Sequence, residues 1–459
     1  MGLFSDLRQA IKNLALMGDM PLGAYRERME RNALERDYYE GDHREQLARK
    51  EGQANDNIIA NFTGLVVDRA ISMLLGNGVE FDLPGDPEYI DDPETGEKIK
   101  QDQPNQEYID EIWLANKKDI LLHKSAQFGG MHGTCYLEIV PDAIQSRTDA
   151  ERFLPRLIPL DPAYMTVDTS PEDIDNVIRY VMVFPVAIGD QKYNRKHEVE
   201  RATVTVDKDG NPTNNPEEIE GMMDQNWVIN EYITDSSGKW QQYKEPEIWP
   251  FEFPPIIHWQ NLPLAGNEYG RPDISPDVID LQDRINFVAS NINRIIRYHA
   301  HPKTWGRGAG MGGKMSWGAD EVLLLQGDNA MLENLEMQSD LVSSRDFFRD
   351  LRQALFDITR TPDITSMSDK LGALTNFGLR VLFMDALAKL GSKQKLYGEA
   401  LTEVNHRMLV LQGGFEDTDG GKVLWQDPLP VSEQEATEAQ QFDLDNGIAS
   451  KETVATKRG

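Results

Sequence analysis

Two expected helices with one apolar stripe each are the feature that most constrains this chain. The first helix, over 274–300, repeats apolar residues at alternating steps of four and three, namely Leu281, Ile285, Val288, Ile292 and Ile296. The second, over 340–360, carries Phe348, Leu351, Leu355 and Ile358 on one face. Charged side chains fill the other faces, so the pattern predicts an antiparallel pair that buries its stripes within the subunit or between subunits.

The segments around this pair differ in their periodicity. Residues 25–130 have a mainly helical pattern, whereas 133–262 contain β-rich runs such as TCYLEIV and RYVMVFPVAI, separated by turn residues. A polar loop over 361–374 leads into a long helix over 375–412, in which Gly391-Ser392 predicts a kink. The expected class is therefore α+β, with an antiparallel β region between helical parts.

The charge balance excludes one class of function. The chain has 77 acidic residues against 47 basic ones, a formal net charge of -30. Proteins that read DNA sequence with high affinity need clustered Lys and Arg to displace counterions, so this chain is not expected to be one. An acidic wall around DNA that must slide is compatible with the same balance. The mean hydropathy of -0.53 favours an elongated chain, or one that buries surface on assembly.

Cysteine content and hydropathy indicate the compartment. Cys135 is the only cysteine, so no internal disulfide forms, as expected for a reducing cytoplasm. The most apolar long stretch, 58–75, contains Asn61, Asp68 and Arg69, and it predicts a buried helix rather than a membrane span. The N-terminal residues have no uninterrupted apolar run of signal-peptide length.

The strongest resemblance to a catalytic motif is the Gly-rich run from Gly308 to Lys314, which has P-loop spacing. Met315 stands where a P-loop has the magnesium-binding Ser or Thr, and HPKTW is a poor buried strand before it. His299 and His301 lack a third ligand at metal-site spacing. We therefore expect no enzyme, no catalytic residues, no cofactor and no metal.

Several blocks, taken in order, resemble the portal proteins of long-tailed bacteriophages. They are DYYEGDH with NIIANFTGLVVDRAISMLLGNGVEF, LIPLDPAYMTV, PPIIHWQNLP with GRPDISPDVIDLQDRINFVASNI, and the terminal LPVSEQEATEAQQFDLDNGIASKETVATKRG. The likeness runs from residue 25 to the end of the chain. An acidic insertion at 82–106, which predicts a loop or hairpin, and the Gly-rich stretch 306–313 depart from the family pattern.

The resemblance implies a portal-like α+β subunit with a wing, a two-helix stem, a small α/β clip, a long kinked helix and a helical crown. The implied ranges are an N-terminal arm at 1–24, the wing at 25–273, stem helices at 274–300 and 340–360, the clip at 301–339, the tunnel loop at 361–374, the long wing helix at 375–412 and the crown at 413–459.

The same resemblance implies three groups of site residues. The tunnel loop would face DNA with Thr361, Asp363, Thr365, Ser366, Ser368, Asp369 and Lys370. The clip would dock the terminase motor with Lys303, Trp305, Arg307, Lys314 and Trp317. The stem would pair charges across the ring with Arg284, Arg294, Arg297, Arg345, Arg349 and Arg352.

The implied function is a ring of roughly twelve subunits at one capsid vertex, through which double-stranded DNA passes without sequence specificity. Its partners would be the terminase large subunit, the major capsid and scaffolding proteins and a head-completion adaptor, with no membrane contact. The ring would assemble in the host cytoplasm and become part of the virion. Two alternatives stay open at this point: a P-loop-like ATPase or nuclease of the packaging machinery, and a monomeric head-tail adaptor.

Overall fold

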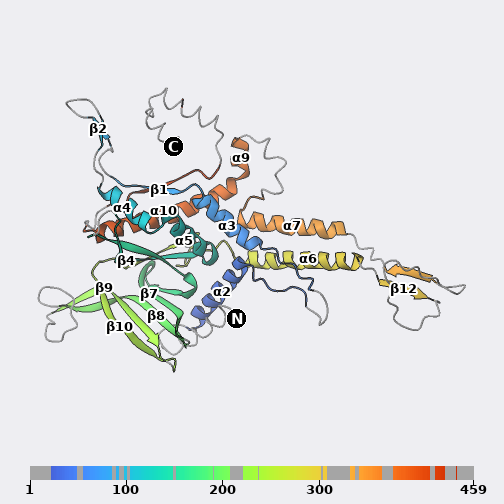
Figure 1. Ribbon diagram of the computed structural model, residues 1–459, viewed down its shortest axis with the longest axis horizontal. Helices are drawn as coiled ribbons and strands as arrows, with labels where there is room; N and C mark the ends of the chain where they lie inside the picture. Colours follow the sequence, from blue (N-terminus) through green and yellow to red (C-terminus); the bar gives the residue numbers. More distant parts are fainter. Residues whose placement is uncertain are drawn as a thin grey trace.

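The computed structural model describes residues 22–48, 55–84, 89–91, 98–100, 104–147, 151–189, 191–206, 221–235, 237–300, 303–307, 331–335, 341–363, 376–413, 419–429 and 441. Figure 1 shows a body of packed helices and sheets from which two long helices project side by side. A small β-hairpin lies at the far end of this projection (Figure 1). The model thus has the α+β class expected from the sequence.

Four helices build the N-terminal part of the body. They are α2 (Leu22–Glu40), α3 (Phe62–Leu75), α4 (Pro104–Ala115) and α5 (Lys118–His132). The side chain of Asn61 caps α3 by accepting a hydrogen bond from the Gly64 N–H, and Gly76 ends it. Within the helical pattern predicted over 25–130, the chain breaks between α4 and α5 at Lys117, whose φ of 57° lies in the left-handed region.

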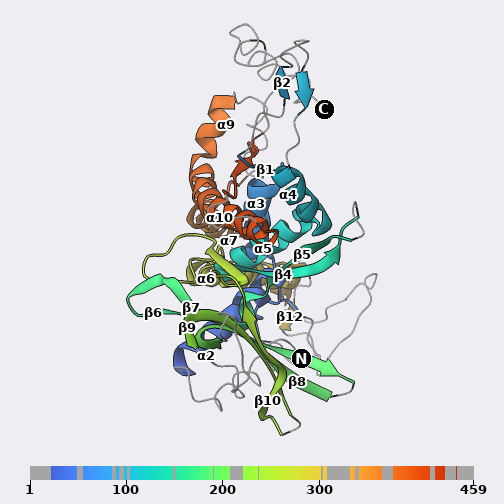
Figure 2. The same ribbon diagram turned by 90° about the vertical axis from the view of Figure 1, so that its left-hand side faces the viewer.

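Two antiparallel sheets form the β region predicted over 133–262. The three-stranded sheet, in the order β11-β4-β5, contains β4 (Thr134–Gln145), β5 (Phe153–Leu160) and β11 (Ile256–Gln260). After the short helix η1 (Pro162–Tyr164), the five-stranded sheet is a meander of β6 (Met165–Ser170), β7 (Asp173–Ile188), β8 (Gln191–Val206), β9 (Gly221–Thr234) and β10 (Trp240–Trp249). Figure 2 shows this sheet at the opposite end of the body from α9.

Three two-stranded ladders complete the described sheets. β2 (Tyr89–Asp91) and β3 (Lys98–Lys100) pair within the acidic insertion, which confirms the hairpin predicted there. β12 (Lys303–Arg307) pairs with β13 (Met331–Leu335) at the tip of the projection. β1 (Val79–Asp82) pairs with β14 (Lys422–Trp425), although some 340 residues separate them along the chain. The helical crown expected over 413–459 is therefore wrong for 419–429, which contain β14, and 430–440 and 442–459 lie outside the described residues.

The projection consists of α6 (Pro276–Ala300) and α7 (Leu341–Thr359), the two helices predicted from the apolar stripes. Their stripes face each other, and at the base they also meet α3. Ile285, Leu355 and Phe356 are fully or almost fully buried in this contact, together with Val66 and Val278. Part of each apolar stripe is thus buried within one subunit.

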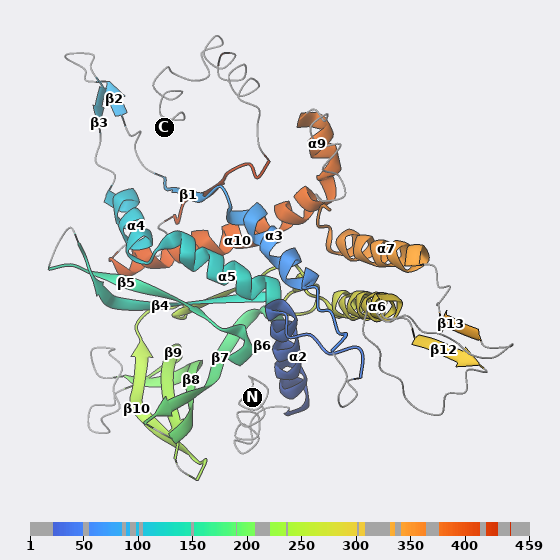
Figure 3. The ribbon, with the colours of Figure 1, turned by 45° about the vertical axis from the view of Figure 1, so that its right-hand side comes forward.

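The long C-terminal helix has its break at a different position from the one predicted. α9 (Asn376–Leu382) and α10 (Met384–Leu411) are separated at Phe383, and α9 turns away from the direction of α10 (Figure 3). Gly391 and Ser392 lie inside α10, so the helix is not interrupted at the position where the kink was predicted. A helix tolerates an isolated Gly when its neighbours pack well, as those of α10 do.

α10 crosses the centre of the body and holds it together. Leu401, Val404 and Met408 are buried against the N-terminal helices and the three-stranded sheet. The Trp113 indole N–H of α4 donates to Asn405 Oδ1 of α10 at 2.8 Å, and both side chains are buried. No helix in the described part of the chain is long and apolar enough to cross a membrane.

Candidate functional site at the base of the helical hairpin

Three helices meet at a buried carboxylate where the projection joins the body. Asp273 lies just before α6 and has no exposed side-chain surface. Lys389 and Lys393, one turn apart on α10, bind it at 2.6 Å and 2.5 Å. The Lys389 ammonium also donates to the carbonyl oxygen of Thr359, the last residue of α7, at 2.9 Å. One side chain therefore joins the start of α6 and the end of α7 to α10.

Electrostatics keep this cluster charged. Burial by itself would raise the pKa of Asp273, but the two ammonium groups outweigh it and hold that pKa at about 2. Burial lowers the pKa of Lys393, while its attraction to Asp273 acts in the opposite direction. The carboxylate is thus ionised at neutral pH, and its neighbours compensate the cost of burying it.

The single cysteine lies beside this cluster without being activated. Cys135 donates to the Ser125 carbonyl oxygen at 3.0 Å, and its sulfur lies 3.3 Å from the Tyr397 hydroxyl. Burial raises the pKa of the Cys135 thiol to about 12, so it is protonated at neutral pH. Among the described residues, no group of His, Cys, Asp and Glu has the arrangement of a metal site.

The first residues of the predicted DNA loop are held inside the subunit. Thr361 is 9% exposed, and its hydroxyl accepts a hydrogen bond from the Thr359 hydroxyl at 3.0 Å. Asp363 accepts from Arg352 of α7 at 2.7 Å. In this conformation the Thr361 hydroxyl is therefore bonded within the subunit and Asp363 is paired with Arg352, while the contact of this loop with DNA stays a prediction. Thr365, Ser366, Ser368, Asp369 and Lys370 lie outside the described residues.

The predicted stem arginines divide into three groups. Arg294 and Arg297 of α6 bind the buried Asp56 of their own subunit, at 3.3 Å and 2.7 Å. Arg352 binds Asp363 within the subunit, and Arg349 makes an exposed pair with Asp346 at 3.6 Å. Arg284 and Arg345 are exposed. Arg294, Arg297 and Arg352 therefore have partners inside the subunit, and their pairing across a ring stays a prediction.

The tip of the projection carries the predicted docking residues. Lys303, Trp305 and Arg307 alternate along β12, opposite Leu335, Glu333 and Met331 of β13. Lys314 and Trp317 lie outside the described residues. The strand before the Gly-rich run is therefore part of a two-stranded antiparallel ladder, whereas a P-loop follows a buried parallel strand.

Large apolar side chains remain exposed along the projection, and they include Ile296 and Ile358 of the predicted stripes. Phe287 of α6 is 42% exposed, and it shares its face with Asp280 and Arg284 at helical spacing. On α7, Phe347 and Ile358 share one face and are 54% and 46% exposed. Each of the two helices of the projection thus exposes at least one large apolar side chain.

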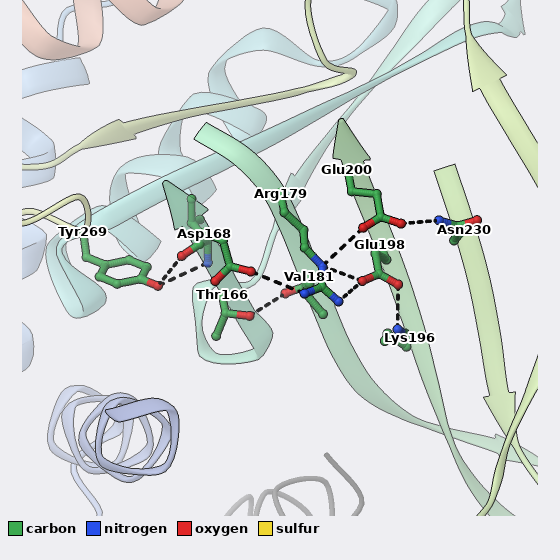
Figure 4. Close-up of polar contacts among 10 residues, drawn as sticks. Thr166, Asp168, Arg179, Val181, Lys196, Glu198, Glu200, Asn230 and Tyr269 are labelled. Carbon is green, nitrogen blue, oxygen red and sulfur yellow. Dashed lines mark hydrogen bonds and ion pairs between the residues drawn. The ribbon is translucent and has the colours of Figure 1, made fainter. Parts of the chain in front are cut away.

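A second polar cluster lies on the five-stranded sheet. Figure 4 shows Arg179 of β7 between Asp168 of β6 and Glu198 and Glu200 of β8. Lys196, whose side chain is 4% exposed, also binds Glu198, at 2.6 Å. Every charge in this row has an opposite neighbour, so the cluster joins adjacent strands and has no group free to act on a substrate.

Sequence reasoning missed the residues that hold the base of the projection. Asp273 and Arg69 lie within blocks that resemble the portal proteins, but the sequence assigned no role to them or to Lys389, Lys393 and Asp56. One signal was available: Lys389, Lys393 and Tyr397 repeat every four residues beside apolar Ala386 and Leu390, which places polar groups on the buried face of α10. The partner of such a stripe depends on the tertiary fold, so the stripe alone does not identify Asp273.

Comparisons with known proteins were made for the whole chain. A family model described as "Phage portal protein, SPP1 Gp6-like" matches residues 23–457. Among solved structures, a chain of the "Virion of native gene transfer agent (GTA) particle" is similar, with a TM-score of 0.38 and 12% sequence identity. That match covers 85% of each chain. No curated protein matches.

Proposed function

The chain belongs to the SPP1 Gp6-like phage portal protein family, and from this premise we propose that it forms the ring channel for packaging and ejection of double-stranded DNA. Portal proteins are structural components of the virion, and the family assembles as a ring in the capsid. The observation that best supports a ring for this chain is the set of apolar side chains left exposed on both helices of the projection.

A closed ring requires two different faces that fit each other, because each subunit contacts one neighbour on each side. Phe287 on α6 and Phe347 with Ile358 on α7 supply an apolar position on each of two helices. Their burial between neighbours would contribute about half of the roughly 1.5–3 kcal/mol of full burial for each side chain, because each is about half exposed in the isolated subunit. Twelve subunits of 52.0 kDa would give a ring of roughly 620 kDa.

The charge of the chain favours DNA passage over DNA capture. A subunit charge of -30 makes the net interaction of a ring with duplex DNA repulsive. Screening limits this interaction to about 8 Å at physiological salt, so only groups close to the phosphates act on DNA. We assign this contact to loop 361–374 beyond Asp363, where Asp369 repels and Lys370 attracts. Such a wall holds DNA weakly and without sequence preference.

The remaining roles follow the predicted division of the chain. We assign docking of the terminase large subunit, and later of the head-completion adaptor, to residues 301–339 at the tip, through Lys303, Trp305, Arg307, Lys314 and Trp317. We assign contact with the capsid and scaffolding proteins to the wing, 25–273, and place the crown, 413–459, inside the capsid. Assembly would occur in the host cytoplasm.

The ring is tested on the purified full chain by light scattering and by particle counting in electron micrographs. We expect a closed ring, and a mass of one subunit at every concentration and salt would contradict the proposal.

The DNA contact is tested by packaging into proheads with Asp369→Lys portal. We expect slower packaging with unchanged ring mass, because an added cation at the wall holds phosphates. Glu172→Lys is the control, since it makes the same charge change in an exposed turn of the five-stranded sheet. Equal packaging rates in Asp369→Lys and wild type would show that this loop does not face DNA.

A further inference from the structure

We propose that Lys389 is a positioning residue for the loop that follows α7: it fixes the start of that loop to α10 and, through Asp273, to the start of α6. The role of the loop in DNA passage rests on the proposed function, whereas the positioning itself rests on the contacts of Lys389. Lys389 and Lys393 both bind Asp273, but only Lys389 also contacts Thr359 at the end of α7. Variants of the two lysines therefore separate the two contacts.

Three cations from three helices hold the five residues that end α7 and begin the loop. Lys389 of α10 donates to the Thr359 carbonyl at 2.9 Å. Arg69 of α3 donates to the Pro362 carbonyl at 2.8 Å. Arg352 of α7 donates to Asp363 at 2.7 Å. The loop therefore leaves the body from a point that α3, α7 and α10 determine together.

Among these cations, Lys389 has the contact nearest to the helix end. The last carbonyl groups of a helix have no partner within it and carry its partial negative charge, so an ammonium group there is favourable. Arg360, directly after Thr359, has a φ of 54°, and its N–H and that of Thr361 turn back to the Asp357 and Phe356 carbonyls. This left-handed turn sets the direction in which the loop departs.

Lys389 is also the cation that joins this turn to α10 and, through Asp273, to the start of α6. Its side chain is 11% exposed, and it reaches Asp273 at 2.6 Å with the same ammonium that binds Thr359. A cavity of about 250 Å³ adjoins the contact and is lined in part by Arg271, Ser275 and Arg360. Thr359 and Lys389 line the same cavity, so their contact borders open space.

Lys393 provides a matched control. It binds the same carboxylate, at 2.5 Å, and its side chain is even less exposed, at 4%. Its described contact is with Asp273, whereas Lys389 contacts Thr359 as well. Replacing either lysine by methionine removes one ammonium from Asp273, but Lys389→Met alone also removes the contact with the end of α7.

The test is hydrogen exchange of the full-length ring, read at the Arg360 and Thr361 amides. Lys389→Met is expected to raise exchange there about tenfold, because the turn loses the group that holds it closed. Lys393→Met is expected to raise exchange of the Arg360 and Thr361 amides no more than it raises exchange of the amides of α10. Equal increases in the two variants would overturn the inference, since Lys389 would then act only as a partner of Asp273.

Packaging into proheads provides the second readout. Lys389→Met is expected to slow packaging more than Lys393→Met at equal ring mass. If exchange rises only in Lys389→Met while packaging is normal, the positioning stands and the proposed contact of the loop with DNA fails. If Lys389→Met does not fold, Lys389→Gln and Lys393→Gln are compared in the same way, and equal exchange at the turn in these two again overturns the inference.

Discussion

Arg352 donates a hydrogen bond to the carboxylate of Asp363 at 2.7 Å, so the loop that follows α7 is bound back to α7 at its start. Both side chains are largely covered, with 25% and 12% exposure. Asp363 therefore has a structural contact to lose, so its substitution changes the stability of the subunit as well as the charge of the loop.

For this reason Asp363→Lys is expected to destabilise the subunit. The variant places a third cation near Arg352 and Arg69 and removes a charge-assisted hydrogen bond, a loss of about 1–2 kcal/mol in the free energy of unfolding. Asp363→Asn keeps an acceptor for Arg352 and is expected to lose less. Thermal unfolding of the two variants and the wild type measures this, and equal stability of all three would show that the ion pair is unimportant.

Phe287→Glu and Phe347→Glu are each expected to dissociate the ring. Each variant puts a carboxylate where we place an apolar contact between neighbours, and burying an unpaired charge costs several kcal/mol. The isolated subunit should keep its stability within about 0.5 kcal/mol, because both side chains are exposed in it. Light scattering follows the mass, with Tyr243→Glu as an equally exposed control on β10. A ring that persists in both variants would place the subunit interface elsewhere.

Lys314→Ala is expected to leave any residual ATP hydrolysis unchanged. The Gly-rich run lacks the P-loop Ser or Thr at Met315, and it follows a strand of a two-stranded antiparallel ladder. Phosphate release by the purified protein and the variant measures this. Hydrolysis that disappears in Lys314→Ala would favour the ATPase alternative.

Glu35 predicts a pH dependence of stability. Burial raises its pKa to about 8, against the attraction of Arg31 and Arg28, and it lies 3.4 Å from the buried His132. Because the pKa of Glu35 is higher in the folded than in the unfolded protein, its protonated form stabilises the fold. This contribution is fully present below pH 4.5, the unfolded pKa, and is lost as the pH rises towards 8. Burial lowers the pKa of His132, so that ring affects stability below 6.5 instead.

Between pH 6.5 and 8, the free energy of unfolding is expected to fall by up to about 1.4 kcal/mol per pH unit because of Glu35. Glu35→Gln removes this titration, so its stability should fall less steeply over the same range. Urea unfolding at several pH values compares the two slopes. Parallel slopes would mean that Glu35 is already ionised in the folded protein.

The fold could be predicted from the sequence where local patterns decide it. The stripes of α6 and α7, the turn-separated strands of 133–262 and the hairpin in the acidic insertion follow from periodicity and turn residues. The helix breaks at Lys117 and Phe383 could not be predicted in this way, because neither position is a Pro or a Gly and tertiary packing sets both. β14 was not predicted, because its partner strand β1 is some 340 residues away and leaves no local pattern in the sequence.

The candidate site was less predictable than the fold. Charged residues on α6 and α7 indicated ion pairs, but the sequence does not show that Asp56 is the partner of Arg294 and Arg297. The resemblance implied that the loop residues face DNA, yet Thr361 is polar and buried, with its hydroxyl bonded to that of Thr359. Polarity predicts exposure only when no partner is near, and partners distant in sequence leave no local pattern.

The pairing of β1 with β14 has a consequence for synthesis on the ribosome. Val79 of β1 emerges some 340 residues before its partner Trp425. Until then the edge of β1 and the surface that α10 later covers remain open, while the β meander between them has only local partners to find. The body of a subunit therefore closes only after α10 and β14 have been synthesised. Before that point a nascent chain has no completed body to offer a neighbour.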